Sequence, residues 1–131
     1  MAHANGTFEV KITPQPTDDK DSGLGRMSID KQFHGDLEGS SKGEMLTGMT
    51  NVKGSAGYVA MEKVRGTLQG KRGTFILQHS GTMDRGAAQL SVTVVPDSGT
   101  DELVGLSGAL TIKVADGKHF YDFEYAIAKS D

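Results

Sequence analysis

Polar and apolar residues alternate with a period of two along most of the chain, and no segment shows convincing helical periodicity. Glycine-rich joints separate the alternating segments, a pattern that is typical of consecutive β-hairpins. Eight antiparallel strands remove their exposed edges most simply by closing on themselves. We therefore predict an all-β, eight-stranded antiparallel closed barrel, with strands at about 6–13, 24–34, 43–52, 57–68, 73–83, 88–96, 108–115 and 118–128.

Two segments interrupt this rhythm. TPQPTDDKDSGLG, Thr13 to Gly25, holds two of the three prolines and several acidic residues, which predicts a long exposed loop. PDSGTDELVGLSG, Pro96 to Gly108, predicts at most one short helical turn with Thr100 as its N-cap, and this segment could cover one mouth of the barrel. A chain of 131 residues suits one compact domain spanning 1–131.

The turn QGKR suggests which side chains share a face, because a hairpin turn determines which residues stand opposite each other. With Gly70 and Lys71 at its tip, Glu62 stands opposite His79. The rest of that face is apolar, so we expect it to line the interior of the barrel. Its other members are Tyr58, Ala60, Val64, Gly66, Phe75, Leu77, Gly81 and Met83.

A second turn, VADGKH, supports the same kind of assignment, since Asp-Gly is a strong signal for a two-residue hairpin turn. Centring the turn on Asp116 and Gly117 predicts an inward face of apolar and aromatic residues. The predicted pairs are Val114 with His119, Ile112 with Tyr121, Leu110 with Phe123 and Gly108 with Tyr125.

The second and third strands could add charge to the lumen. Lys31 has the same parity as Met27, Ile29 and Phe33, which we expect to point inward. The third strand is ambiguous: either Met45, Thr47 and Met49 point inward, or Glu44, Leu46 and Gly48 do. In the second case Glu44 could pair with Lys31.

An ionised carboxylate or imidazolium in an apolar lumen is costly unless it is paired, so Glu62 and His79 are expected to stabilise each other. They could act as a catalytic acid–base pair, or they could serve only to satisfy their own hydrogen bonds. Burial and mutual pairing shift their pKa values in opposite directions, so the sequence leaves their protonation open. The residues expected to contact a ligand are Tyr58, Leu77, Tyr121, Phe123, Tyr125, Lys31 and Glu44.

Composition excludes several other chemistries. The chain has no cysteine, and Glu62 with His79 supplies too few ligands for a metal, so we expect no metal site and no cofactor. A net charge of −3 with interspersed signs argues against nucleic-acid or membrane partners. With no apolar run long enough for a signal peptide or a membrane span, we expect a cytoplasmic protein.

Four runs resemble a bacterial family of small proteins catalogued as a domain of unknown function and regarded as an allene-oxide-cyclase-like barrel. They are GTFEVK, KQFHGDLEGSSKGEML, GSAGYVAMEKVRGTLQGKRGTFILQHSGTM and VVPDSGTDELVGLSGALTI. The resemblance implies an eight-stranded barrel with a central cavity, often assembled as a homo-oligomer, dimer or trimer, and no established reaction. Family-like positions are Lys31, Glu44, Glu62, Gln78 and His79.

Three functions remain open at this stage. The first is a barrel that binds a small apolar organic ligand in its lumen near Glu62 and His79. The second is a cofactor-independent isomerase or cyclase that uses this pair as acid and base. The third is a non-catalytic assembly protein with a filled barrel, whose outward residues Val59, Met61 and Ile76 form the contact.

Overall fold

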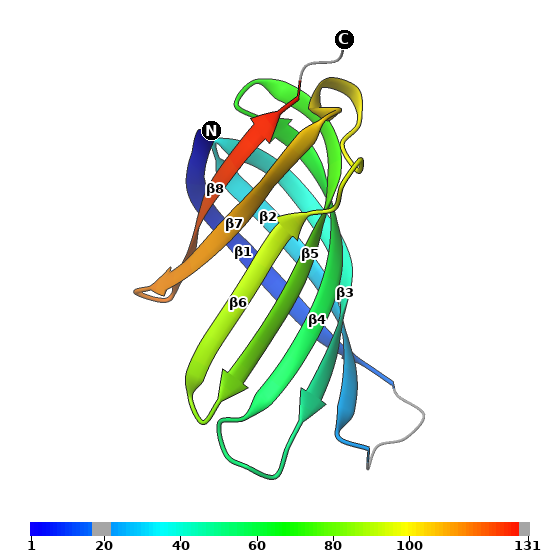
Figure 1. Cartoon of the computed structure of the whole chain (residues 1–131), viewed down its shortest axis with the longest axis vertical. Coiled ribbons are helices and arrows are strands. Elements are labelled where there is room, and N and C mark those ends of the chain that lie inside the picture. The colour runs from blue at the N-terminus through cyan, green and yellow to red at the C-terminus, as the bar shows by residue number, and fades with distance from the viewer. Residues whose placement is uncertain (17–21, 129–131) are drawn as a thin grey trace.

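The computed structural model describes residues 1–16 and 22–128, and it confirms a closed eight-stranded antiparallel barrel (Figure 1). Each strand pairs with its neighbour in sequence, and the last strand returns to pair with the first. Within the described residues, no helix has the length and apolar character needed to cross a bilayer. The elements are β1 (Ala2–Gln15), β2 (Leu24–Gly35), β3 (Leu37–Met49), β4 (Ala56–Leu68), β5 (Lys71–Asp84), β6 (Ala87–Val94), a single 3-10 turn η1 (Asp101–Leu103), β7 (Leu106–Ala115) and β8 (Lys118–Ile127).

Two strands begin several residues before the positions that the alternation indicated, β1 and β3. β1 begins at Ala2, and it continues to Gln15, inside the segment that we expected to be a loop; residues 17–21 of that loop lie outside the described part. β3 begins at Leu37 because the stretch LEGSSKGE pairs with β2 on one side and with β4 on the other. Glycine and serine have weak strand preference, so here the two neighbouring ladders override local propensity.

The β4–β5 hairpin has a register that differs by two residues from the predicted one. Its turn is centred on Gln69 and Gly70, with φ of 45° and 87°, the positive values that a type I′ turn requires at both positions. Glu62 therefore stands opposite Leu77 rather than His79. A shift of two preserves the face of every side chain, so both titratable residues still point inward. The predicted β7–β8 register is confirmed.

One end of the barrel, which we call the closed end, is filled by aromatic and aliphatic side chains. Phe75 and Phe123 stack with ring centroids 5.8 Å apart. The chain between β6 and β7 covers this end by placing Leu103 of η1 in the core. Thr100 occupies the predicted N-cap position without a side-chain capping bond; its hydroxyl accepts a hydrogen bond from the backbone N–H of Thr74 instead.

The opposite end, which we call the open end, is incompletely walled. Within the described residues, Thr93 and Ala109 form the only residue pair that joins β6 to β7, and β8 pairs with β1 only as far as Phe8. Figure 1 shows the β7–β8 hairpin ending part of the way along the molecule, while β3 to β6 continue to the lower end. Over this lower end, the described part of the chain therefore places no strand of β7 or β8 opposite the inner face of β3 to β6.

Gly73 offers a test of how tightly the covering segment packs. A Cβ at this position would lie 2.2 Å from the carbonyl oxygen of Thr100, whereas a Cβ at Gly57 of β4 would have no neighbour closer than 3.7 Å. We expect Gly73→Ala to lower the free energy of unfolding by about 1–3 kcal/mol and Gly57→Ala to change it by less than about 1 kcal/mol. Urea unfolding of both variants measures this; equal effects would contradict the close packing of this segment.

Candidate functional site

Three donors surround a buried carboxylate in the middle of the lumen. Glu62 is 1 % exposed, and its Oε1 accepts hydrogen bonds from Lys31 Nζ at 3.0 Å and from His79 Nε2 at 2.7 Å. Its Oε2 accepts a hydrogen bond from Ser41 Oγ at 2.7 Å. All four side chains are buried, and they come from four consecutive strands, β2 to β5. We call these four residues the Glu62 cluster.

Small residues on β3 make the Lys31–Glu62 contact possible. Lys31 lies on β2 and Glu62 on β4, so their side chains must meet across the strand between them. At that level β3 presents Ser41 opposite Lys31 and Gly43 opposite Glu62. A Cβ at Gly43 would lie 2.8 Å from the Cβ of Glu62, so any larger residue would crowd the carboxylate. The absent side chain leaves the path between ammonium and carboxylate clear.

Aromatic rings shield the lysine on its other side. The Lys31 ammonium lies 4.9 Å from the ring centroid of Phe8 and 5.8 Å from that of Phe33. Such cation–π contacts are attractive and strengthen when the cation is removed from water. The prediction that Lys31 enters the lumen is confirmed, since its side chain is buried.

The cluster holds Glu62 in its ionised form. Burial by itself raises the pKa of this carboxyl, but the His79 hydrogen bond, the Lys31 charge and the Ser41 hydrogen bond together lower it from 4.5 to about 2. Glu62 is therefore a carboxylate at neutral pH with no proton to donate. Because a carboxylate can only accept hydrogen bonds, Nε2 of His79 must carry the proton that lies between them.

Tyr58 stands next to the cluster on its open side. Its ring centroid is 6.5 Å from that of His79, and its ring lies against Gly81, where a Cβ would come within 2.4 Å of Tyr58 Cε1. Burial and the nearby Glu62 charge raise the pKa of the Tyr58 phenol, so it remains a neutral hydroxyl. Among the described residues, no hydrogen-bond partner for this hydroxyl is found.

An apolar pocket of about 370 Å³ extends from Tyr58 into the open end. It lies on the inner face of β3 to β6, beyond the point where the β7–β8 hairpin ends. Its inward side chains are mostly methionine, leucine and alanine, and its lining consists of Met45, Thr47, Met49, Ala56, Gly57, Tyr58, Gly81, Thr82, Met83, Ala88, Gln89 and Leu90. The ambiguity of the third strand is thereby resolved, because Met45, Thr47 and Met49 face inward.

The Lys31–Glu44 pair that one of the two parities of the third strand would have allowed does not form. Glu44 lies on the outer wall, where its carboxylate is 3.5 Å from the Nε atom of Arg26. Successive side chains of β3 point to opposite faces of the sheet. Ser41 and Met45 point inward, so Glu44 points outward. Lys31 pairs with Glu62 instead, so Glu44 is removed from the candidate site.

Four other expected ligand contacts lie toward the closed end. Leu77 is fully buried opposite Glu62. The Tyr121 hydroxyl donates to the carbonyl oxygen of His34 and accepts from the backbone N–H of Leu37, and the Tyr125 hydroxyl donates to Gln69 Oε1. Phe123, Tyr121 and Tyr125 belong to the packed core, and none of them lines the apolar pocket.

Sequence reasoning missed Ser41, although a signal for it was present. The β2–β3 hairpin turns at Gly35 and Asp36, a glycine-containing turn in which Gly35 has a φ of 107°. The observed register is centred on Asp36 alone, which places Ser41 directly opposite Lys31 and gives β3 its inward face. No group of three or more His, Cys, Asp or Glu side chains that could hold a metal occurs within residues 1–16 and 22–128.

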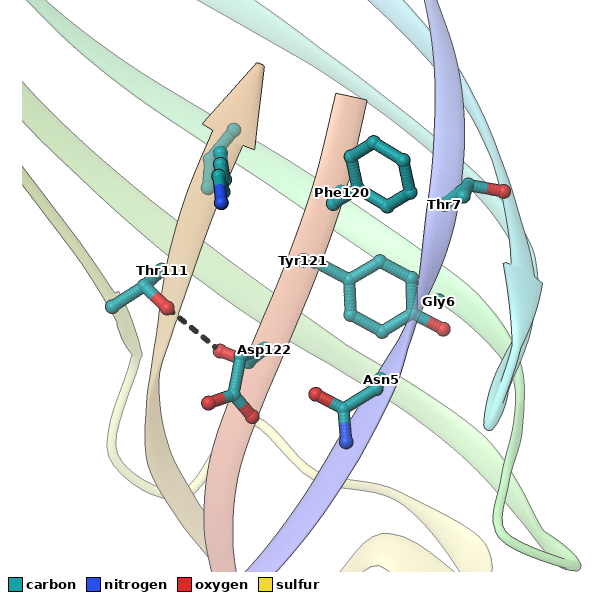
Figure 2. Close-up of a pocket in the computed structure, with 9 residues that line it drawn as sticks. Asn5, Gly6, Thr7, Thr111, Phe120, Tyr121 and Asp122 are labelled. Atoms are coloured by element: carbon teal, nitrogen blue, oxygen red, sulfur yellow. Dashed lines mark hydrogen bonds between the residues drawn. The ribbon is translucent and has the colours of Figure 1, made fainter. Parts of the chain in front are cut away.

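A wider groove of about 650 Å³ crosses the outer wall over β1, β7 and β8 (Figure 2). Figure 2 shows Asn5 of β1 and Phe120 and Asp122 of β8 along it, with the Thr111 hydroxyl donating to the carbonyl oxygen of Asp122. The Asp122 carboxylate is already engaged by His3 at 3.1 Å. This groove lacks a buried charge, so we place the candidate site at the Glu62 cluster and the adjoining pocket.

The fold and this cluster define a small β-barrel with an ionic group sealed in its lumen and an apolar pocket beside it. Residues 4–125 match the family described as "Protein of unknown function (DUF3224)", and the chain belongs to that family. It is similar to a crystal structure of a DUF3224 protein of unknown function from Shewanella oneidensis MR-1, with 48 % identity, coverage of 99 % of each chain and a TM-score of 0.95. A search among curated proteins finds no match. The DUF3224 match confirms the family resemblance, and neither match carries an allene-oxide-cyclase name.

Acid should weaken the fold through Glu62. Its folded-state pKa lies below the unfolded value, so its contribution to stability is complete above pH 4.5 and is lost as the pH falls toward 2. A shift of this size corresponds to on the order of 3 kcal/mol. Urea unfolding between pH 7 and pH 3 measures the decline; it should be shallower in a Lys31→Met/Glu62→Gln variant, and identical slopes would show that another carboxyl is responsible.

Removal of the Glu62 charge alone should lower the free energy of unfolding more than removal of both the Glu62 and the Lys31 charges. Glu62→Gln leaves the buried Lys31 ammonium without its counter-charge, and breaking a buried pair in this way costs about 3–5 kcal/mol. The double variant Lys31→Met/Glu62→Gln removes both charges and should recover about 1 kcal/mol or more of that loss. Chemical denaturation provides the measurement; a double variant less stable than the single one would rule out this ion pair as the main constraint.

Proposed function

We propose that this barrel binds a small apolar ligand in the pocket at its open end. The observation that supports the proposal is exposure on the inner face: Met49, Met83 and Leu90 point toward the lumen, yet they are 65 %, 44 % and 46 % exposed. Inward apolar side chains normally complete a core, and concave apolar surface left open to water is typical of ligand sites. Three rotatable bonds and a polarisable sulphur let methionine adapt to different occupants.

The Glu62 cluster supplies the fixed inner wall of this site. Its hydrogen bonds hold His79 in one orientation, and Tyr58 packs beside that ring at the inner end of the pocket. A rigid polar end with an adaptable apolar body orients a ligand that carries one polar group.

Acid–base catalysis by Glu62 is less well supported than binding. Both carboxylate oxygens are occupied by donors, and the low pKa makes Glu62 a weak base and leaves it no proton to give. Of the original pair, His79 alone retains a nitrogen that could exchange protons with a ligand. We therefore assign Glu62 the role of a positioning residue.

An outer contact surface is a second candidate, compatible with the first. Leu46 and Val59 stand opposite each other on the outer wall, and Met61 follows them; all three are more than half exposed. A group of exposed apolar side chains on a sheet is typical of protein contacts. The expected homo-oligomer would use this face, and sedimentation velocity of Met61→Asp against wild type would test it.

A charge placed on the inner wall should abolish binding of an apolar probe. Leu90→Asp introduces a carboxylate into the pocket, whereas Leu24→Asp introduces the same group on the outer face of β2, where the leucine is 66 % exposed. We expect Leu90→Asp to weaken binding of the neutral fluorophore N-phenyl-1-naphthylamine at least about tenfold. The Leu24→Asp variant should bind as wild type does.

Fluorescence titration measures these affinities, with circular dichroism as the check on folding. Failure of the wild-type protein to bind the probe, or equal binding by both variants, would overturn the assignment of the site. Native mass spectrometry of the purified protein then identifies any compound that the pocket retains.

A further inference from the structure

We propose that the pocket selects apolar ligands that carry a hydroxyl group, and that this hydroxyl donates a hydrogen bond to Nδ1 of His79. The inference rests on the proposed ligand-binding function and names the chemical class of its ligand. Three observations support it: the fixed tautomer of His79, the access to its second nitrogen, and the absence of charge in the pocket wall.

The tautomer follows from the partner of the first nitrogen. Nε2 of His79 lies 2.7 Å from Oε1 of Glu62, and an ionised carboxylate accepts only. In a neutral imidazole, a proton on Nε2 leaves a lone pair on Nδ1. When the imidazole is neutral, Nδ1 is therefore a hydrogen-bond acceptor that the cluster holds in one orientation.

The second nitrogen remains accessible from the lumen. Within residues 1–16 and 22–128, no buried side-chain nitrogen or oxygen lacks a hydrogen-bond partner, yet Nδ1 of His79 has none there. Nδ1 is therefore not sealed from solvent, although the residue as a whole is only 4 % exposed. The side chain lies on the inward face of β5, with Phe75, Leu77 and Gly81.

The apolar pocket ends one inward position short of His79. His79, Gly81 and Met83 occupy successive inward positions on β5, and the pocket wall includes the last two. Residues two apart on a strand are separated by about 6.5–7 Å, so His79 lies one inward position beyond the pocket. The Tyr58 ring covers Gly81, where a Cβ would come within 2.4 Å of its Cε1, so a ligand would reach His79 past the edge of this ring.

The surrounding charges favour a neutral hydroxyl over an ionic head group. His79 faces Glu62 and Tyr58 on β4, Lys31 reaches it only through Glu62, and the neighbouring inward residue on β6 is the apolar Val92. Because Lys31 and Glu62 already neutralise each other, an anionic or a cationic head group would be desolvated without a free counter-charge. A ketone or an ether cannot donate to Nδ1. An alcohol or a phenol can.

The experiment compares 2-naphthol with 2-methoxynaphthalene, which keeps the ring and the oxygen but has no proton to donate. Isothermal titration calorimetry at pH 7 gives both dissociation constants for wild type and for His79→Gln. A glutamine amide at position 79 can still donate to Glu62 through its Nε2, but it lacks the ring nitrogen that would accept from the ligand. We expect the ratio of the two affinities to shift by about three- to tenfold against 2-naphthol in the variant, the effect of one net hydrogen bond.

A second measurement does not depend on the stability of the variant. In wild-type protein with ¹⁵N-labelled histidine, 2-naphthol should shift the Nδ1 resonance of His79 toward that of a hydrogen-bonded acceptor, and 2-methoxynaphthalene should not. An unchanged affinity ratio, or an unmoved Nδ1 resonance at saturation with 2-naphthol, overturns the hydroxyl preference while ligand binding itself stands. If neither naphthalene binds wild type, the proposed function fails together with the inference.

Discussion

The structure depends on the neutralisation of one buried charge. An ionised Glu62 with no partners would be strongly unfavourable in the lumen, and it persists because Lys31, His79 and Ser41 converge on it. Those donors lie on β2, β3 and β5, so the cluster is satisfied only when three hairpins adopt their native registers together. A slip of one residue in any of them would turn a donor to the outside and leave the carboxylate unpaired.

The cluster also divides the barrel into two parts with different chemistry. On one side, Phe75, Phe123 and their neighbours fill the interior. The hydroxyls of Tyr121 and Tyr125 there form hydrogen bonds with backbone and side-chain partners. On the other side, apolar side chains face an interior that no strand among the described residues covers. Lysine and glutamate thus stand at the boundary between a packed core and a cavity, which explains how a small barrel can be stable and still retain space for a ligand.

Strand alternation was sufficient to predict the barrel, the inward face of β4, β5, β7 and β8, and the burial of Glu62 and His79. The direct opposition of these two residues was wrong, because a glycine can occupy either central position of a two-residue turn and each choice gives its own register. The Lys31–Glu62 pair could not be derived from any single hairpin, since these residues lie on strands that are not neighbours. Their contact depends on the small side chains of β3 that lie between them, a property of three strands together. The three aromatic residues of β8 were correctly expected to point inward, but parity alone does not distinguish a filled level of the lumen from an empty one.

The junction of β6 and β7 gives the barrel a built-in line of weakness. Every other neighbouring pair of strands is joined by seven or more residue pairs, whereas this one has a single pair among the described residues, Thr93 with Ala109. Separation of β6 from β7 breaks few backbone hydrogen bonds, so local opening costs the least free energy at this junction, while the other seven strand pairs stay intact. The barrel therefore has one weak seam, and opening along it would widen the lumen while the other seven ladders stay intact.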